Sequence, residues 1–287
     1  MTENEFTRPF PALTPAQRYH LEVYGYVLIE NTLTTDENGR LLEAMLRLKS
    51  DLLATDDPAQ ARVRNCRLSG YRPQYLHFAH ILEADPAIFD YLTHPRLVGM
   101  AEELVGGSVR LEESEAVINL RDPETDLSAA PHYGFHAGTN PDVGTYVENG
   151  LYHCTFVKTL TNLTALGPDD GGTVVIAGSH KVKGNREAII AAAYDDPTLI
   201  HQVVAPAGST LLFGEALIHA TGLIRSDRER VIVIGGYTPP MFQAWNGQEP
   251  SAEFVEKTPE HLKPLISGSD RWSWKARRRS LEMPVAE

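Results

Sequence analysis

Short β-type runs fill the chain from residue 109 onwards, and this pattern restricts the possible folds more than any other feature of the sequence. The runs are rich in β-branched and apolar residues, and loops containing Gly, Pro and Asp separate them. They cover residues 109–120, 151–163, 172–176, 210–213 and 231–236. Because these strands do not alternate with helices, a parallel α/β sheet is disfavoured. The pattern indicates a mainly β fold of the sandwich or jelly-roll type with flanking helices.

The first hundred residues predict helices around one short strand. Thr14 can cap a helix that has a proline in its first turn, and Thr34 can cap a second helix whose apolar residues share one stripe. Residues 24–29, between these two segments, form an apolar and aromatic run that predicts a strand. Residues 79–105 predict further helix, with prolines marking starts or breaks.

These patterns predict a single domain over residues 1–287. A helical support of about residues 1–108 is expected to precede a jelly-roll core of about residues 109–240. Residues 184–202 predict a helical insertion in that core, and residues 241–287 predict a peripheral C-terminal segment.

The composition narrows the classes of function. The chain has 287 residues, 42% of them hydrophobic, and a formal net charge of −12. A negative field repels phosphate backbones and anionic lipid headgroups, so we expect neither a nucleic-acid polymer nor a membrane as a partner. No run reaches the ~18 apolar residues of a membrane-spanning helix. The two cysteines, Cys66 and Cys154, predict neither a disulfide framework nor a zinc cluster, and a cytoplasmic enzyme fits best.

Four segments carry a resemblance to a known family. They read LTPAQRYHLEVYGYVLIENTLT, THPRLVGMAEELVGGSV, DDGGTVVIAGSHK and GSTLLFGEALIHATG, the last followed by RSDRERV. In this order, between residues 13 and 238, they resemble the phytanoyl-CoA dioxygenase-like family of Fe(II)- and 2-oxoglutarate-dependent oxygenases. The resemblance implies a double-stranded β-helix of the jelly-roll, cupin-like type. It also implies an oxidoreductase that uses Fe(II), 2-oxoglutarate and O2 on a small molecule.

The closing pair of segments contains His219, with Arg230 eleven residues later. By matching position, His219 resembles the distal iron ligand, and Arg230 resembles the cation that pairs with the far carboxylate of 2-oxoglutarate. A guanidinium suits this task because its fork donates two parallel hydrogen bonds to a carboxylate. Thr221 stands where the family has a small hydroxyl residue that assists this carboxylate, and Asn119 is assigned to the same pocket. A surface salt bridge with neighbouring acids is the alternative role of Arg230.

The proximal half of the expected iron site departs from the family pattern. The family needs a histidine followed at plus two by a carboxylate, which completes a triad of two histidines and one carboxylate. Here the sequence reads PHYGFHAGTN over residues 131–140, and either histidine register gives H-x-G. We assign His136 as the proximal ligand, because it stands just before the loop and strand that follow the family motif. His132 is kept as a substrate-pocket candidate, and Gly138 marks the vacated carboxylate position.

Three interpretations of Gly138 remain open. In the favoured one, chloride occupies the open position on iron, as in halogenases of this superfamily that have glycine or alanine there. The chain would then be a chlorinase of an unactivated C–H bond. In the second, water or another carboxylate fills the position and the enzyme is a hydroxylase. Glu215 is the obvious candidate, but in one continuous strand it would lie ~13 Å from His219. In the third the site is inactive, which would leave a non-catalytic jelly-roll binding module.

The expected substrate is a small molecule of a biosynthetic pathway. Residues 62–80 and the loop 139–150 are expected to bind it. Arg67 and Arg72 give the first of these segments a local positive charge, which favours a phosphorylated or carboxylated compound. The chain length and the H-x-G motif are similar to those of an actinobacterial nucleotide chlorinase, which implies a nucleotide as one candidate. A basic tail at residues 275–279 gives the same indication. Pairing of these arginines with surface acids is the alternative.

Overall fold

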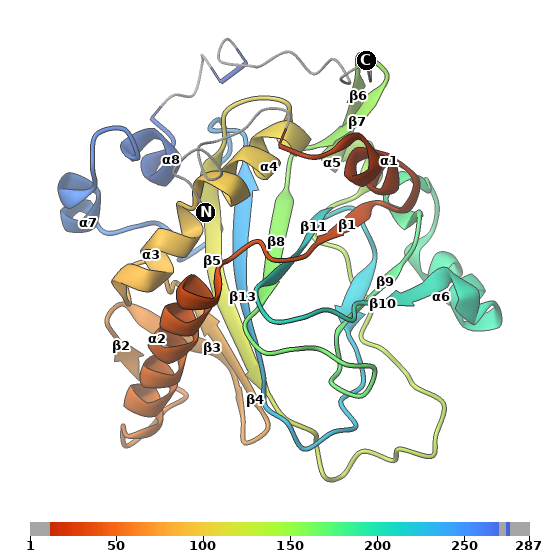
Figure 1. Ribbon diagram of the computed structural model, residues 1–287, viewed down its shortest axis with the longest axis horizontal. Helices are drawn as coiled ribbons and strands as arrows, with labels where there is room; N and C mark the ends of the chain where they lie inside the picture. The colour runs from red at the N-terminus through yellow and green to blue at the C-terminus, as the bar shows by residue number, and fades with distance from the viewer. Residues whose placement is uncertain (1–11, 270–273, 276–287) are drawn as a thin grey trace.

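Antiparallel β-sheets form the centre of the computed structural model, which describes residues 12–269 and 274–275 (Figure 1). The described residues contain an eight-stranded sheet, a three-stranded sheet and a two-stranded ribbon. The large sheet has the order β1 (Tyr26–Ile29), β11 (Ser209–Gly214), β8 (Val157–Asn162), β13 (Arg230–Thr238), β5 (Arg110–Asn119), β4 (Tyr75–Ala79), β3 (Cys66–Arg72) and β2 (Arg62–Val63). The small sheet has the order β10 (Ile200–Gln202), β9 (Thr173–Ile176) and β12 (His219–Thr221), and the ribbon pairs β6 (Thr145–Glu148) with β7 (Leu151–Cys154). This arrangement confirms the predicted jelly-roll class.

Helices cover one face of the large sheet, and the small sheet lies on the other side (Figure 1). The covering helices are α2 (Thr35–Leu53), α3 (Pro86–Leu92) and α4 (Pro95–Val105). The remaining helices are α1 (Pro15–Tyr24), α5 (Pro141–Gly144), α6 (Arg186–Asp195), α7 (Ala252–Lys257) and α8 (Lys263–Ser267). Thr14 and Thr34 each complete a capping box at the start of a helix, as the sequence predicts.

Side-chain alternation along the strands separates two cores on the two faces of the large sheet. In β11, Leu212 packs into the core under the helices, whereas Leu211 and Phe213 pack toward the small sheet. Neighbouring strands follow the same rule, so that every second residue of β5, β8 and β13 faces the space between the sheets. The candidate site lies in this space.

The segment expected to be a helical support contributes four strands to the large sheet. Residues 62–79 form the outer strands β2 to β4, and β4 pairs with β5 through Tyr75 opposite Asn119. The predicted helix over 79–105 begins only at Pro86, because β4 extends to Ala79. These outer strands escaped prediction because a strand with many exposed residues, such as the arginine-rich β3, lacks continuous apolar alternation. Most of the basic tail, residues 276–279, lies outside the described residues.

None of the helices in the described residues is long and apolar enough to cross a membrane.

Candidate active site

His136 and His219 lie side by side between the sheets. Their backbones form an isolated antiparallel bridge with two N–H···O bonds of 2.9 Å, and their ring centroids are 4.3 Å apart. His219 begins β12, which pairs with β9, so the small sheet holds the distal histidine, and the bridge then holds His136 against it. The chain therefore brings together two histidines that are 83 positions apart, as the sequence analysis expects.

Hydrogen bonds to backbone carbonyls fix the orientation of both rings. Nδ1 of His136 donates to the carbonyl of Gly134 at 3.1 Å, and Nδ1 of His219 donates to the carbonyl of Leu217 at 2.9 Å. Burial lowers the pKa of His219, which favours the neutral ring. A neutral imidazole whose Nδ1–H is fixed presents the lone pair of Nε2, as metal-binding histidines do. In the described part of the chain, no group of three His, Cys, Asp or Glu side chains is arranged to hold a metal.

Arg230 is a buried cation without a carboxylate partner among the described residues. Its side chain is 3% exposed, and its guanidinium donates only to Asn119 Oδ1 at 3.3 Å and to Thr173 Oγ1 at 3.5 Å. Its Nε has no hydrogen-bond partner. Burial lowers the pKa of Arg230 to about 10. Because an unpaired buried charge is costly, this position favours binding of an anion.

Two threonines complete the surroundings of this cation. Thr221 in β12 lies opposite Thr173 in β9, and both line the same cavity as Arg230. The sequence analysis selected Thr221 and Asn119 but missed Thr173. The signal that could have found Thr173 is its place directly after the double glycine of the DDGGTVV segment, which resembles a family motif.

Gly138 leaves room for the carboxylate of Glu215. A Cβ atom added at Gly138 would lie 2.0 Å from Oε2 of Glu215 and 2.9 Å from its carboxyl carbon. Any side chain at residue 138 would therefore displace Glu215. Glu215 is also the charged group with the largest electrostatic effect on His219. A carboxylate is thus present beside the two histidines, although it does not come from residue 138.

The expectation of ~13 Å between Glu215 and His219 does not hold, although among the described residues no group of three metal-binding side chains includes Glu215. It assumed one continuous strand, but β11 ends at Gly214 and β12 begins at His219 in the other sheet. The four intervening residues turn the chain, with Leu217 N–H bonded to the Gly214 carbonyl at 2.9 Å. A turn shortens the distance between positions i and i+4, so both side chains reach the same cavity.

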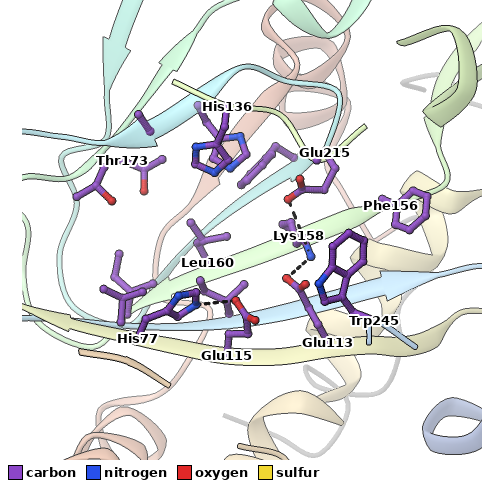
Figure 2. Close-up of a pocket in the computed structure, with 18 of the residues that line it drawn as sticks. His77, Glu113, Glu115, His136, Phe156, Lys158, Leu160, Thr173, Glu215 and Trp245 are labelled. Atoms are coloured by element: carbon purple, nitrogen blue, oxygen red, sulfur yellow. Dashed lines mark hydrogen bonds and ion pairs between the residues drawn. The ribbon is translucent and has the colours of Figure 1, made fainter. Parts of the chain in front are cut away.

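Beyond the histidines, the cavity wall carries a buried ionic cluster. Lys158 in β8 forms ion pairs with Glu113, with Glu112 at 3.4 Å and with Glu215 at 4.0 Å (Figure 2). Burial opposes the charge of Lys158, but the three carboxylates together raise its pKa. Burial also raises the pKa of Glu112 and raises that of Glu113 to about 7, because Lys158 compensates only in part. Glu115 lies further along β5 and bonds His77 at 2.8 Å.

This cluster predicts a specific effect of pH on stability. The folded pKa of Glu113, about 7, lies above its unpaired value of 4.5, so the protonated carboxyl is the stable form in the folded protein. Its contribution is complete below pH 4.5 and is lost as the pH rises through 7. Glu113→Gln should therefore raise the free energy of unfolding at pH 8 by about 1–3 kcal/mol and leave it nearly unchanged at pH 4.5. Chemical denaturation at both pH values tests this, and an equal effect at both would contradict it.

Most of these groups line one cavity of about 260 Å³, whereas Asn119 lies behind Arg230 and is not among the lining residues. The lining includes both histidines, Gly138, Arg230 and Glu215, with Trp245 at its exposed edge. Three glutamates of β5, named the acidic wall below, complete the lining: Glu112, Glu113 and Glu115. His132, Arg67 and Arg72 are not among the lining residues: His132 stacks on Tyr194, and the guanidinium of Arg72 lies 5.3 Å from the centre of the Tyr75 ring. The candidate substrate residues from the sequence thus lie outside the cavity in this conformation.

Comparisons with known proteins agree with this geometry. The family model for phytanoyl-CoA dioxygenase (PhyH) matches residues 21–232. A search of curated proteins finds no match. Among solved structures, HygX from Streptomyces hygroscopicus with nickel and 2-oxoglutarate bound is similar, with a TM-score of 0.64 and 20% identity over 81% of this chain and 90% of that chain.

Two further structures share the fold at lower identity. AviO1 from Streptomyces viridochromogenes Tue57 has a TM-score of 0.61 and 17% identity over 80% of this chain and 96% of that chain. SnoK, a non-heme alpha-ketoglutarate-dependent carbocyclase from nogalamycin biosynthesis, has a TM-score of 0.59 and 16% identity over 86% and 92%. Because the family model covers most of the sequence, from the end of the first helix to the strand that carries Arg230, the chain belongs to the phytanoyl-CoA dioxygenase family.

Proposed function

We propose that this oxidoreductase is an Fe(II)- and 2-oxoglutarate-dependent oxygenase that oxidises a C–H bond of a small molecule. The observation that carries the proposal is the buried Arg230, unpaired among the described residues, in the same cavity as two histidines with free Nε2 atoms. When bound, iron and 2-oxoglutarate would supply the activation of O2. The solved structure of HygX with nickel and 2-oxoglutarate supports these cofactors by analogy of fold.

The protein's own residues hold and orient the reactants. His136 and His219 would bind the metal through Nε2, because their Nδ1–H groups are fixed to backbone carbonyls. Arg230 would clamp the far carboxylate of 2-oxoglutarate, with Thr173 and Thr221 as neighbouring hydroxyl groups. Asn119 holds the guanidinium through Oδ1. The cavity beyond the histidines would position the substrate carbon.

Oxygenation is favoured over halogenation by the place of Glu215. A halide beside Gly138 would share its surroundings with the Glu215 carboxylate, which already lies where a residue-138 side chain would begin. Like charge and occupied volume both oppose a bound anion. We therefore propose that Glu215 supplies the negative charge that an aspartate at residue 138 would supply. Chlorination, with chloride as a further cofactor, is the second candidate, and the missing side chain at Gly138 favours it.

The proposed substrate is a small molecule present in the cytoplasm. Solved structures of similar fold hold small molecules: HygX with hygromycin B, and the epimerase SnoN with nogalamycin RO. A phosphorylated or carboxylated substrate would require Arg67 or Arg72 to turn toward the cavity, which they do not line. The two cysteines are free and buried, which suits a reducing compartment.

Anaerobic addition of Fe(II) and 2-oxoglutarate tests the proposed function. A metal-to-ligand charge-transfer band should appear only when both are present, and admission of O2 should release succinate. Protein that gives neither the band nor succinate would be a binding module instead. Product masses with and without chloride then separate the two candidates, since a chlorinated product would support the second.

Arg230→Leu should weaken 2-oxoglutarate binding strongly. Loss of a buried charge-assisted contact costs about 2–5 kcal/mol, which corresponds to at least ~30-fold in dissociation constant. Metal affinity without 2-oxoglutarate should stay within about twofold, because Arg230 does not bond either histidine. Arg228→Leu is the matched control, since that neighbouring arginine pairs with Asp170 and does not line the cavity. Equal 2-oxoglutarate affinity in the Arg230 variant and the wild type would remove Arg230 from the cosubstrate pocket.

A further inference from the structure

We propose that the substrate of this cavity carries a cationic amine. The amine binds Glu113 and Glu115 of the acidic wall, near Trp245 at the edge of the cavity. The inference rests on the proposed function and names the class of its substrate. It differs from the phosphorylated or carboxylated compound that the arginines of residues 62–80 favour in the sequence.

The acidic wall is built by a β-bulge. Residues 113, 115 and 117 face the cavity by strand alternation, and Glu112 would normally face the helices. The pairing of β13 with β5 shifts between Gly236 and Tyr237, so that Glu112 has no partner opposite it. Because of this bulge, Glu112 and Glu113 both reach the cavity and Lys158.

Gly236 makes room for this cluster. A Cβ atom at residue 236 would lie 2.5 Å from Cγ of Glu113 and 2.8 Å from both Glu112 Oε2 and Lys158 Nζ. A glycine in the middle of a strand weakens the strand and often marks a close approach. The sheet is thus shaped around buried charges, and Lys158 offsets the cost of burying the Glu113 carboxylate only in part, as the raised pKa of Glu113 indicates. Such a cost is expected where a ligand uses the charges.

Carboxylates outnumber cationic groups along this wall. The formal charges of Fe(II), 2-oxoglutarate, Arg230 and Glu215 sum to zero. Three glutamates, Glu112, Glu113 and Glu115, then remain along the wall together with Lys158 and His77. His77 already bonds Glu115, and Lys158 is held by the other two glutamates, Glu112 and Glu113. With Glu113 ionised and His77 neutral, the wall carries excess negative charge, and an ammonium group bound beside Glu113 would favour that ionised form by lowering the raised pKa of its carboxyl. An anionic substrate would be repelled here, whereas an ammonium group would complete the charge balance.

Aromatic rings stand at the edge of the same wall. Figure 2 shows Trp245 beside Glu113, with Phe156 nearby. Trp245 is 56% exposed, and its backbone N–H donates to the Glu112 carbonyl at 2.9 Å. A ring face beside carboxylates attracts alkylammonium groups through cation–π and charge interactions together. The buried Arg230, whose Nε has no hydrogen-bond partner among the described residues, lines the same cavity.

A set of size-matched probes tests the charge preference. Glucosamine, glucose and glucose 6-phosphate are titrated into the full chain loaded with Ni(II) and 2-oxoglutarate at pH 7, with ligand-detected NMR as the readout. Glucosamine should bind at least about tenfold more tightly than glucose, a difference of ~1.4 kcal/mol, and glucose 6-phosphate should bind most weakly. Added salt should weaken glucosamine binding and leave glucose binding unchanged.

Variants of the wall assign the preference to named residues. Glu113→Gln, Glu115→Gln and the double variant should reduce or remove the preference for glucosamine. Glu256→Gln, a control that removes an exposed charge on α7, should keep it. The proposal is overturned if glucosamine does not bind at millimolar concentration, if glucose 6-phosphate binds as well, or if the Gln variants keep the wild-type preference.

Metal and 2-oxoglutarate binding are measured separately, so that the two proposals fail independently. If Ni(II) and 2-oxoglutarate bind but the amine preference is absent, the substrate class is wrong and the proposed function stands. If they do not bind, the proposed function fails regardless of the probes. Arg230→Leu should lose 2-oxoglutarate and still prefer glucosamine.

Discussion

Replacing His219 by alanine is expected to abolish metal binding and 2-oxoglutarate turnover. No third His, Cys, Asp or Glu of the described residues joins His136 and His219 in a metal-holding group, so the loss of one ring leaves a single fixed imidazole. His136→Ala should have the same effect, because the two rings lie 4.3 Å apart and act as a pair. The measurement is Fe(II) or Ni(II) affinity by equilibrium titration, followed by succinate formation. We expect succinate formation to fall by at least ~100-fold.

His132→Ala is the matched control, since it removes a histidine four positions away that stacks on Tyr194. It should keep wild-type metal affinity. Loss of metal in the His132 variant together with retention in the His136 variant would move the proximal ligand by four residues and contradict the site as built. Circular dichroism of each variant checks that the fold is unchanged.

The second large effect is expected from moving the carboxylate from residue 215 to residue 138. Glu215→Ala should lower metal affinity by at least ~10-fold, since the carboxylate beside Gly138 is removed. Gly138→Asp alone should also be harmful, because its Cβ would meet the Glu215 carboxylate at 2.0 Å. Combining the two gives residue 138 a carboxylate and the space to hold it. The double variant should therefore bind metal more tightly than either single variant.

Metal titrations of the four proteins, with and without chloride, measure this coupling. The halogenase interpretation predicts a different pattern, in which Glu215→Ala keeps metal affinity and strengthens the effect of chloride. It also predicts that Gly138→Asp excludes chloride whether or not Glu215 is present. If the losses of metal affinity add up in the double variant, the side chains of residues 215 and 138 do not occupy the same space.

The sequence by itself determined the strand-rich core, the helix starts at Thr14 and Thr34, and the resemblance that selects His219 and Arg230. These features depend on local patterns: alternation, capping residues and a short motif of neighbouring residues. They can be recognised without knowing which distant residues are in contact. The family model and the similar solved structures confirm the family and the fold, whereas the roles of the individual residues stay predictions.

Only the tertiary structure decided what surrounds those residues. The turn between β11 and β12 places Glu215 beside Gly138, although 77 positions separate them. The bulge in β5 brings Glu112 to Lys158 from another strand, and no periodicity in β5 alone shows which of its glutamates face a cavity. The arginines of β3 give the sequence a positive segment but do not line the cavity. The charge of a binding site depends on which side chains meet across strands, and that is a property of register and turns rather than of composition.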